Sequence, residues 1–199
     1  MNPLKRYLQN CAKPEANGFG RLVLKGMNSG HRKLHSWLLE NVEIPESGTV
    51  LDVGCGGGAL IKSVLSRNDS LKAVGIDISE ESVKMVSSIS ERVEARCCDI
   101  RQIPYPDNTF SLALSSESIY FWNDIPSCLL AVKRVLKEGS VFALAVESAD
   151  KKKGGIWMKR IPGMMIYSPT DLKVFFAEAG FQHVEVIRRK DWCLVKGMK

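Results

Sequence analysis

The stretch TVLDVGCGGGAL, residues 49–60, constrains the fold of this chain more than any other segment. Apolar residues run into four glycines, and a helix-like apolar pattern follows, so the stretch predicts a buried strand, a tight loop and a helix. A glycine loop in that place lets a ligand approach the main chain, where free N–H groups at the helix start favour negative groups. The loop therefore predicts a cofactor site.

Strand and helix patterns alternate along the rest of the chain. Helix starts carry capping residues, as at Ser79, Asp124 and Ser168. This alternation predicts an α/β fold: a doubly wound, Rossmann-like, seven-stranded and mostly parallel sheet with helices on both faces. The last two strands, which only Asp191 separates, are expected to form an antiparallel terminal hairpin. The expected strands lie at residues 49–54, 71–79, 93–99, 109–116, 140–147, 184–190 and 192–199.

The length of 199 residues fits a single domain, residues 1–199. Residues 19–41 contain two amphipathic helical patterns, broken at Asn28-Ser29-Gly30. We expect residues 1–41 to form an N-terminal helical cap in which residues 17–37 act as a lid. Residues 48–199 are expected to form the Rossmann-like core. Within it, residues 150–168 follow the fifth strand as a long insertion, which predicts a substrate-side loop.

The charge is uneven along the chain. The net charge is +6, and residues 1–36 hold seven Lys and Arg against one acid, Glu15. This basic segment is either a solvated face or a surface that attracts an anionic substrate, nucleic acid or acidic lipid. We favour the solvated face, because aromatic residues do not alternate with the basic ones as in single-strand binders.

The chain shows no stretch of 18 apolar residues and no signal-peptide core at its start, so we expect no membrane span and a cytoplasmic location. Six cysteines match neither a zinc motif nor a disulfide framework. For the adjacent pair Cys97-Cys98, packing at a strand end and binding of a soft metal both stay open.

The glycine loop by itself fits two cofactors. Gly54-Cys55-Gly56-Gly57-Gly58-Ala59 satisfies the dinucleotide pattern G-x-G-x-x-G/A, and Asp77 ends the next strand about twenty residues on, where an acid meets a ribose. An NAD-type oxidoreductase is therefore one alternative. Asp52 favours the other, because an acid two residues before the first glycine disfavours a pyrophosphate and suits a ligand with a cationic amine.

The segment from Asp52 to Gly58 resembles motif I, D/E-x-G-x-G-x-G, of the class I S-adenosylmethionine-dependent methyltransferases. VGIDIS and CCDIRQIPYPDNTFSLALSSES resemble the family's second and third regions, and the resemblance covers about residues 34–199. It implies that Asp77 binds the ribose hydroxyls and that Asp99 and Ile100 bind adenine. The cofactor-binding residues expected from it are Asp52, Gly54, Gly56, Asp77, Ile78, Asp99, Ile100 and Ser116.

The resemblance implies transfer of a methyl group by in-line displacement, with S-adenosylhomocysteine as the product. The nucleic-acid signatures N-P-P-Y and Pro-Cys are absent, so a small-molecule acceptor is the first hypothesis and an RNA methyltransferase the alternative. No catalytic residue is assigned; His31, Glu117 and Tyr120 are candidates for handling a proton. The acceptor and the oligomeric state stay open, and no metal ligand is expected.

Overall fold

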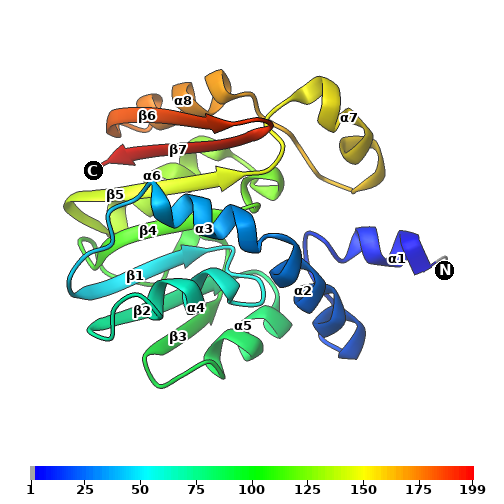
Figure 1. Ribbon diagram of the computed structural model, residues 1–199, viewed down its shortest axis with the longest axis horizontal. Coiled ribbons are helices and arrows are strands. Elements are labelled where there is room, and N and C mark those ends of the chain that lie inside the picture. The colour runs from blue at the N-terminus through cyan, green and yellow to red at the C-terminus, as the bar shows by residue number, and fades with distance from the viewer. Residues whose placement is uncertain (1–2) are drawn as a thin grey trace.

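The computed structural model describes residues 3–199 and has a seven-stranded sheet at its centre (Figure 1). The strand order is β3-β2-β1-β4-β5-β7-β6, and only β7 runs against its neighbours. The doubly wound Rossmann-like fold with a terminal hairpin is therefore confirmed. The strands are β1 (Gly48–Val53), β2 (Leu71–Asp77), β3 (Val93–Cys97), β4 (Phe110–Ser116), β5 (Leu136–Val146), β6 (Gln182–Arg189) and β7 (Trp192–Met198).

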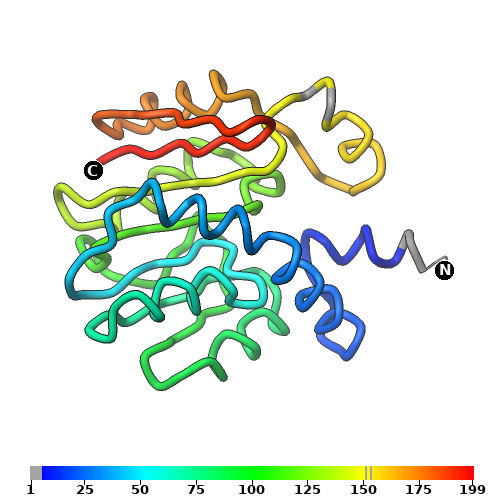
Figure 2. Tube along the Cα trace, in the orientation of Figure 1, coloured from blue at the N-terminus to red at the C-terminus, as the bar shows by residue number. Residues whose placement is uncertain are grey.

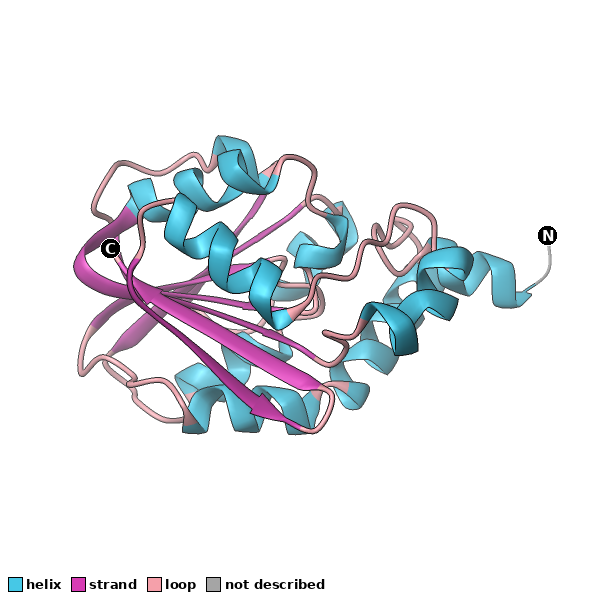
Figure 3. Ribbon diagram, turned by 90° about the horizontal axis from the view of Figure 1, so that it is seen from above, coloured by secondary structure: helices cyan, strands magenta, loops and turns pink. Residues whose placement is uncertain are grey.

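Helices cover both faces of the sheet (Figure 3). Helices α3, α4 and α5 pack on one face, and α6 and α8 pack on the other. Helices α1, α2 and α7 extend beyond the end of the sheet at which β1, β4 and β5 finish (Figures 1 and 2). The helices are α1 (Pro3–Gln9), α2 (Gly18–Gly30), α3 (Arg32–Glu40), α4 (Ala59–Leu65), α5 (Glu80–Ser87), α6 (Ile125–Val135), α7 (Lys151–Arg160) and α8 (Pro169–Glu178).

The caps expected from the sequence form. The Ser79 side chain accepts from the Ser82 N–H at the start of α5, and Asp124 accepts from the Ser127 N–H at the start of α6. Ser168 and Asp171 form a reciprocal capping box on α8. These bonds satisfy main-chain donors that a helix leaves unpaired in its first turn.

Three segments differ from the sequence-based expectation. Strand β5 begins at Leu136 and not at Ser140, because Leu136 pairs with Phe110 of β4 and that pairing extends the strand. Helix α2 continues through Asn28 to Gly30 and breaks at His31; the Asn28 side chain bonds the Gly57 carbonyl, which supports this last turn. The insertion at residues 150–168, expected as a loop, contains helix α7.

Among the described residues, no helix is both long enough and apolar enough to cross a bilayer.

Two neighbouring leucines on α6 test the packing of this helix on the sheet. Leu129 is fully buried, whereas Leu130 is 54% exposed. We expect Leu129→Ala to lower the free energy of unfolding by about 2–5 kcal/mol, because it leaves a cavity in the core. Leu130→Ala, the matched control with the same change in helix propensity, should change it by less than about 0.5 kcal/mol. Urea unfolding followed by circular dichroism measures both, and equal losses would contradict the described packing.

Candidate functional site

A large cavity opens at the end of the sheet where β1, β2 and β4 finish, beneath α2. It holds about 1180 Å³ of empty space, including its open mouth. The carboxyl ends of parallel strands meet at this edge, which is where open α/β sheets bind ligands. Two of the three catalytic candidates, His31 and Glu117, line the cavity, and Tyr120 does not. All eight residues expected to bind the cofactor also line it: Asp52, Gly54, Gly56, Asp77, Ile78, Asp99, Ile100 and Ser116.

The glycine loop forms one wall and fits closely against its neighbours. Gly54 has φ +73°, and a Cβ there would lie 2.4 Å from the Cβ of Ser118. A Cβ on Gly57 would lie 2.3 Å from the Asn28 side-chain nitrogen. Both positions exclude larger residues, the first by backbone strain and contact and the second by contact alone. Because the loop lacks side chains at these positions, Ser118 and Asn28 of α2 can pack closely against its backbone.

The Asp77 carboxylate joins the loop to the next strand. Its Oδ2 accepts from the Gly56 N–H at 2.9 Å and its Oδ1 from the Ser79 N–H at 2.8 Å. Burial raises the pKa of Asp77, and these backbone hydrogen bonds oppose the rise. Ile78 follows at the cavity and is 43% exposed. The Asp77 carboxylate, which can accept hydrogen bonds from ligand hydroxyls, therefore lies next to the apolar side chain of Ile78.

Asp52 lies deeper, with 3% of its surface exposed. Burial, reinforced by the charge of Asp77, raises the pKa of Asp52 to about 8. Its Oδ2 is buried and has no hydrogen-bond partner in the described chain. A buried acceptor without a partner is costly, so this carboxyl suits a ligand that brings a cation or a donor.

The opposite wall carries Asp99 and Ile100. Asp99 accepts from the main chain and the guanidinium of Arg101, with the shortest contact, from Nη2 to Oδ2, at 2.7 Å. These bonds lower the pKa of Asp99. Its carboxylate is thus already paired, and an adenine amino group would share it with Arg101. Ser116 Oγ, at the end of β4, is buried without a partner.

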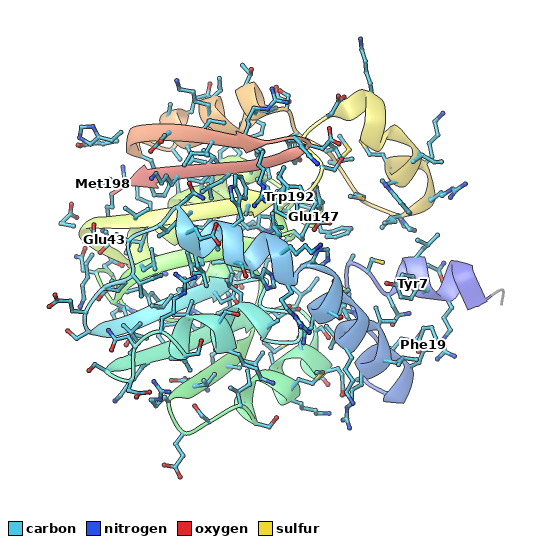
Figure 4. The ribbon with its side chains drawn as sticks, in the orientation of Figure 1. Tyr7, Phe19, Glu43, Glu147, Trp192 and Met198 are labelled. Carbon is cyan, nitrogen blue, oxygen red and sulfur yellow. The ribbon has the colours of Figure 1, made fainter. Side chains whose placement is uncertain are left out.

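A polar cluster forms where the ends of β4 and β5 meet the α2–α3 junction. It consists of His31, Glu117 and Glu147, whose potential ligand atoms all lie within 4.8 Å of one another. His31 Nδ1 lies 3.6 Å from Glu147 Oε2. Figure 4 labels Glu147 at the end of β5 that faces α2 and α7. We refer to these three residues as the acidic cluster.

Glu117 is held firmly within the acidic cluster. Its Oε1 accepts from the Tyr120 hydroxyl at 3.0 Å and from the Glu147 N–H. Tyr120 is buried and also bonds the Ser148 main chain, so it orients Glu117 without reaching the cavity. The backbone of Glu117 has φ +60°, a strained conformation for a residue with a side chain. Such strain tends to occur at functional sites.

Burial sets the protonation of the acidic cluster. It raises the pKa of Glu117 to about 7, and the charge of His31 opposes the rise. Burial lowers the pKa of His31, but its interactions with Glu147 and Glu117 outweigh this and raise it overall. Glu147 was not among the site residues predicted from the sequence. Its position at the end of the fifth predicted strand, at the same edge of the sheet as Glu117, could have indicated it.

Comparison with known proteins shows similarity to methyltransferases. The family model described as a methyltransferase domain matches residues 51–144. The uncharacterized methyltransferase YdaC of Bacillus subtilis is 23% identical over 162 residues, which are 80% of this chain and 86% of that protein. The rat mitochondrial arginine-hydroxylase NDUFAF5 is 33% identical over 100 residues, 50% of this chain and 29% of that protein.

Among solved structures, human N-acetylserotonin methyltransferase in complex with S-adenosylmethionine superposes with a TM-score of 0.76 at 18% identity. The match covers 90% of this chain and 56% of the human chain. The two proteins therefore share a fold over nearly the whole of this chain.

Replacing Asp52 tests whether its carboxyl group is protonated in the folded protein. A folded-state pKa near 8, above the unfolded value, means that its stabilising contribution is full below the unfolded pKa and is lost as pH rises through 8. The free energy of unfolding should therefore fall between pH 5 and pH 8. We expect Asp52→Asn to reduce that slope by about 1 kcal/mol per pH unit.

Urea unfolding of the ligand-free protein at several pH values measures the slope. Asp69→Asn is the control, because the Asp69 side chain is fully exposed and should leave the slope unchanged. An Asp52→Asn protein with the wild-type slope would show that the buried carboxyl is ionised.

Proposed function

We propose that this chain is a class I S-adenosylmethionine-dependent methyltransferase and transfers a methyl group from that cofactor to a small molecule bound beside the acidic cluster. The observation that supports this most is the shared cavity. The glycine loop, Asp52 and Asp77 line the same space as His31 and Glu117. One end of the cavity then suits the cofactor and the other suits an acceptor.

The cavity residues fit the cofactor in charge and shape. We assign the ribose hydroxyls to Asp77, which lines the cavity and whose two oxygens accept from the main-chain N–H groups of Gly56 and Ser79. The unpartnered carboxyl of Asp52 suits the cationic methionine end. Asp99 and Ile100 are assigned to adenine, and Gly54 and Gly56 to the close approach of the main chain. Ser116 Oγ remains as a donor inside the cavity.

When bound, S-adenosylmethionine supplies an activated methyl group, which a nucleophile takes in line with the S–C bond. The chain then has to orient the acceptor and exclude water. His31 and Glu117 lie at the cavity wall and are the groups that handle the acceptor's proton or charge, and Tyr120 positions Glu117.

We further propose that residues 1–41 act as a lid over residues 48–199. Among the contacts that hold the described part of this segment to the core, three lie beside the glycine loop and the start of α5. Asn28 Nδ2 donates to the Gly57 carbonyl at 3.0 Å, Arg21 pairs with the buried Glu81 at 2.7 Å, and Ser79 Oγ donates to the Pro14 carbonyl at 3.1 Å. Each contact joins the lid to the glycine loop or to the start of α5, so lid position and cofactor binding are coupled.

A small-molecule acceptor suits the depth of the site. The α2 helix covers the glycine loop, and Phe121 and Trp122 line the cavity next to Glu117. An aromatic wall beside carboxylates is typical of pockets that enclose most of a small ligand. The substrate-side segment, residues 150–168, borders this region through the Met165 N–H, which bonds the Tyr120 carbonyl.

A transfer assay tests the proposal. Purified protein is incubated with labelled S-adenosylmethionine and separate pools of metabolites and RNA. We expect label in the metabolite fraction. We expect Asp77→Asn to weaken cofactor binding about ten- to hundredfold, because the ribose loses a charged acceptor worth about 1.5–3 kcal/mol. Glu80→Gln, an exposed neighbour outside the cavity, is the matched control.

Label in RNA, lost when Arg21, Arg32 and Lys33 are neutralised, would replace the small-molecule acceptor with RNA. Label in neither pool, together with equal cofactor affinity for wild type and Asp77→Asn, would contradict the proposed function itself.

A further inference from the structure

The acidic cluster brings two carboxyl groups and one imidazole together. Glu117 and Glu147 come from different strands and still place carboxylate oxygens within 4.8 Å of His31 and of each other. In the described part of the chain, no Lys or Arg forms an ion pair with either glutamate; His31 is the partner of Glu147. Two carboxylates held this close repel each other, and a proton or a bound cation relieves that repulsion.

The elements beneath the acidic cluster position its three side chains, and hydrogen bonds also hold Glu117. Glu117 Oε1 is occupied by the Tyr120 hydroxyl and the Glu147 N–H, and no described donor reaches Oε2. Hydrogen bonds of this kind orient the ligands of metal sites from outside. His31 sits where α2 ends and α3 begins, and its Nδ1 is buried without a hydrogen-bond partner. Both glutamates follow buried strands, so the backbone beneath the cluster is rigid.

His35 gives an independent observation. It lies one helical turn after His31, is 8% exposed and lines the same cavity, yet its Nδ1 has no hydrogen-bond partner in the described chain. The two imidazole rings lie 6.4 Å apart. A buried, unpartnered imidazole nitrogen beside the acidic cluster points to a ligand in the space that the rings share.

We propose that His31, Glu117 and Glu147 bind a single divalent transition-metal cation, with His35 at the edge of the site. One imidazole and two carboxylates suit Mn²⁺ or Zn²⁺ better than Mg²⁺, which prefers oxygen ligands and retains its waters. Bonds of about 2.0–2.2 Å place neighbouring ligand atoms about 3.0–3.4 Å apart. The three potential ligand atoms lie within 4.8 Å of one another, so side-chain rotations have to bring them closer to hold an ion.

The site extends the proposed function, on which this step rests, by naming the acceptor's chemistry. Three protein ligands leave coordination positions open towards the cavity. An acceptor with a hydroxyl next to a second oxygen, such as a catechol or an α-hydroxy carbonyl, fills two of them. The cation lowers the pKa of that hydroxyl, and its proton leaves to water. The oxygen then forms the O–CH₃ bond as the S–C bond breaks, and its electron pair stays on sulfur in S-adenosylhomocysteine.

Metal titration of the full chain, stripped with a chelator and without cofactor, tests the site. Calorimetry and the electron paramagnetic resonance of Mn²⁺ report binding without any need for turnover. We expect one Mn²⁺ per chain, and at least tenfold weaker binding in Glu147→Gln and in His31→Ala. Matched controls are Glu40→Gln and His183→Ala, exposed residues of the same types outside the cavity, which should bind as wild type does.

Two results would overturn the site: wild type that binds neither Mn²⁺ nor Zn²⁺ stoichiometrically, or Glu147→Gln and His31→Ala proteins that bind like the controls. Glu147→Gln keeps the side-chain shape, so it serves if His31→Ala does not fold. S-adenosylhomocysteine binding is measured on the same samples. Cofactor binding without metal binding rejects this inference alone, and metal binding without cofactor binding rejects the proposed function alone.

Discussion

The rest of the site depends on the Asp77 carboxylate and its two main-chain hydrogen bonds. Through Gly56 it fixes the glycine loop after β1, and through Ser79 it fixes the start of α5 after β2. Ser79 in turn caps α5 and donates to the Pro14 carbonyl, so the same point also anchors the N-terminal segment. Three segments distant in sequence thus meet at Asp77 and Ser79, and Asp77 lines the cavity.

Several acidic residues lie around one cavity of this basic protein. The net charge is +6, yet burial raises the pKa of Asp52, Asp77 and Glu117 around one cavity. A site of this kind favours positively charged ligands, because a bound cation restores the charge that burial suppresses. At the loop end that ligand is the methionine part of the proposed cofactor, and at the acidic cluster it is the proposed metal ion.

Local patterns in the sequence predicted most of the framework. The glycine loop, the capping residues and the terminal hairpin depend on neighbours in sequence, and the structure has them where expected. Features that depend on distant partners were missed. Leu136 belongs to β5 because of its pairing with Phe110, and α2 extends to Gly30 with the help of Gly57. Whether residues 1–41 close as a lid, and which residues contact the cofactor, are still predictions.

The acidic cluster shows the same limit more sharply. Glu117 was a candidate by its place after the fourth strand, and His31 by its place in the helical cap, but no local pattern joins them to Glu147. Their meeting requires β4 and β5 to be neighbours and α2 to end above them. The strand order makes β4 and β5 neighbours, and the packing of the N-terminal cap places the end of α2 above them. The spacing of residues in the sequence does not reveal either arrangement.

The central claim is that the loop, Asp52 and Asp77 select a methionine-derived cofactor over a dinucleotide. Isothermal titration calorimetry of S-adenosylhomocysteine and of NAD against the same protein preparation tests it most directly. We expect one-site binding of S-adenosylhomocysteine and at least hundredfold weaker binding of NAD, because the pyrophosphate would face the buried acid Asp52. Tighter binding of NAD than of S-adenosylhomocysteine would show that the cavity is a dinucleotide site.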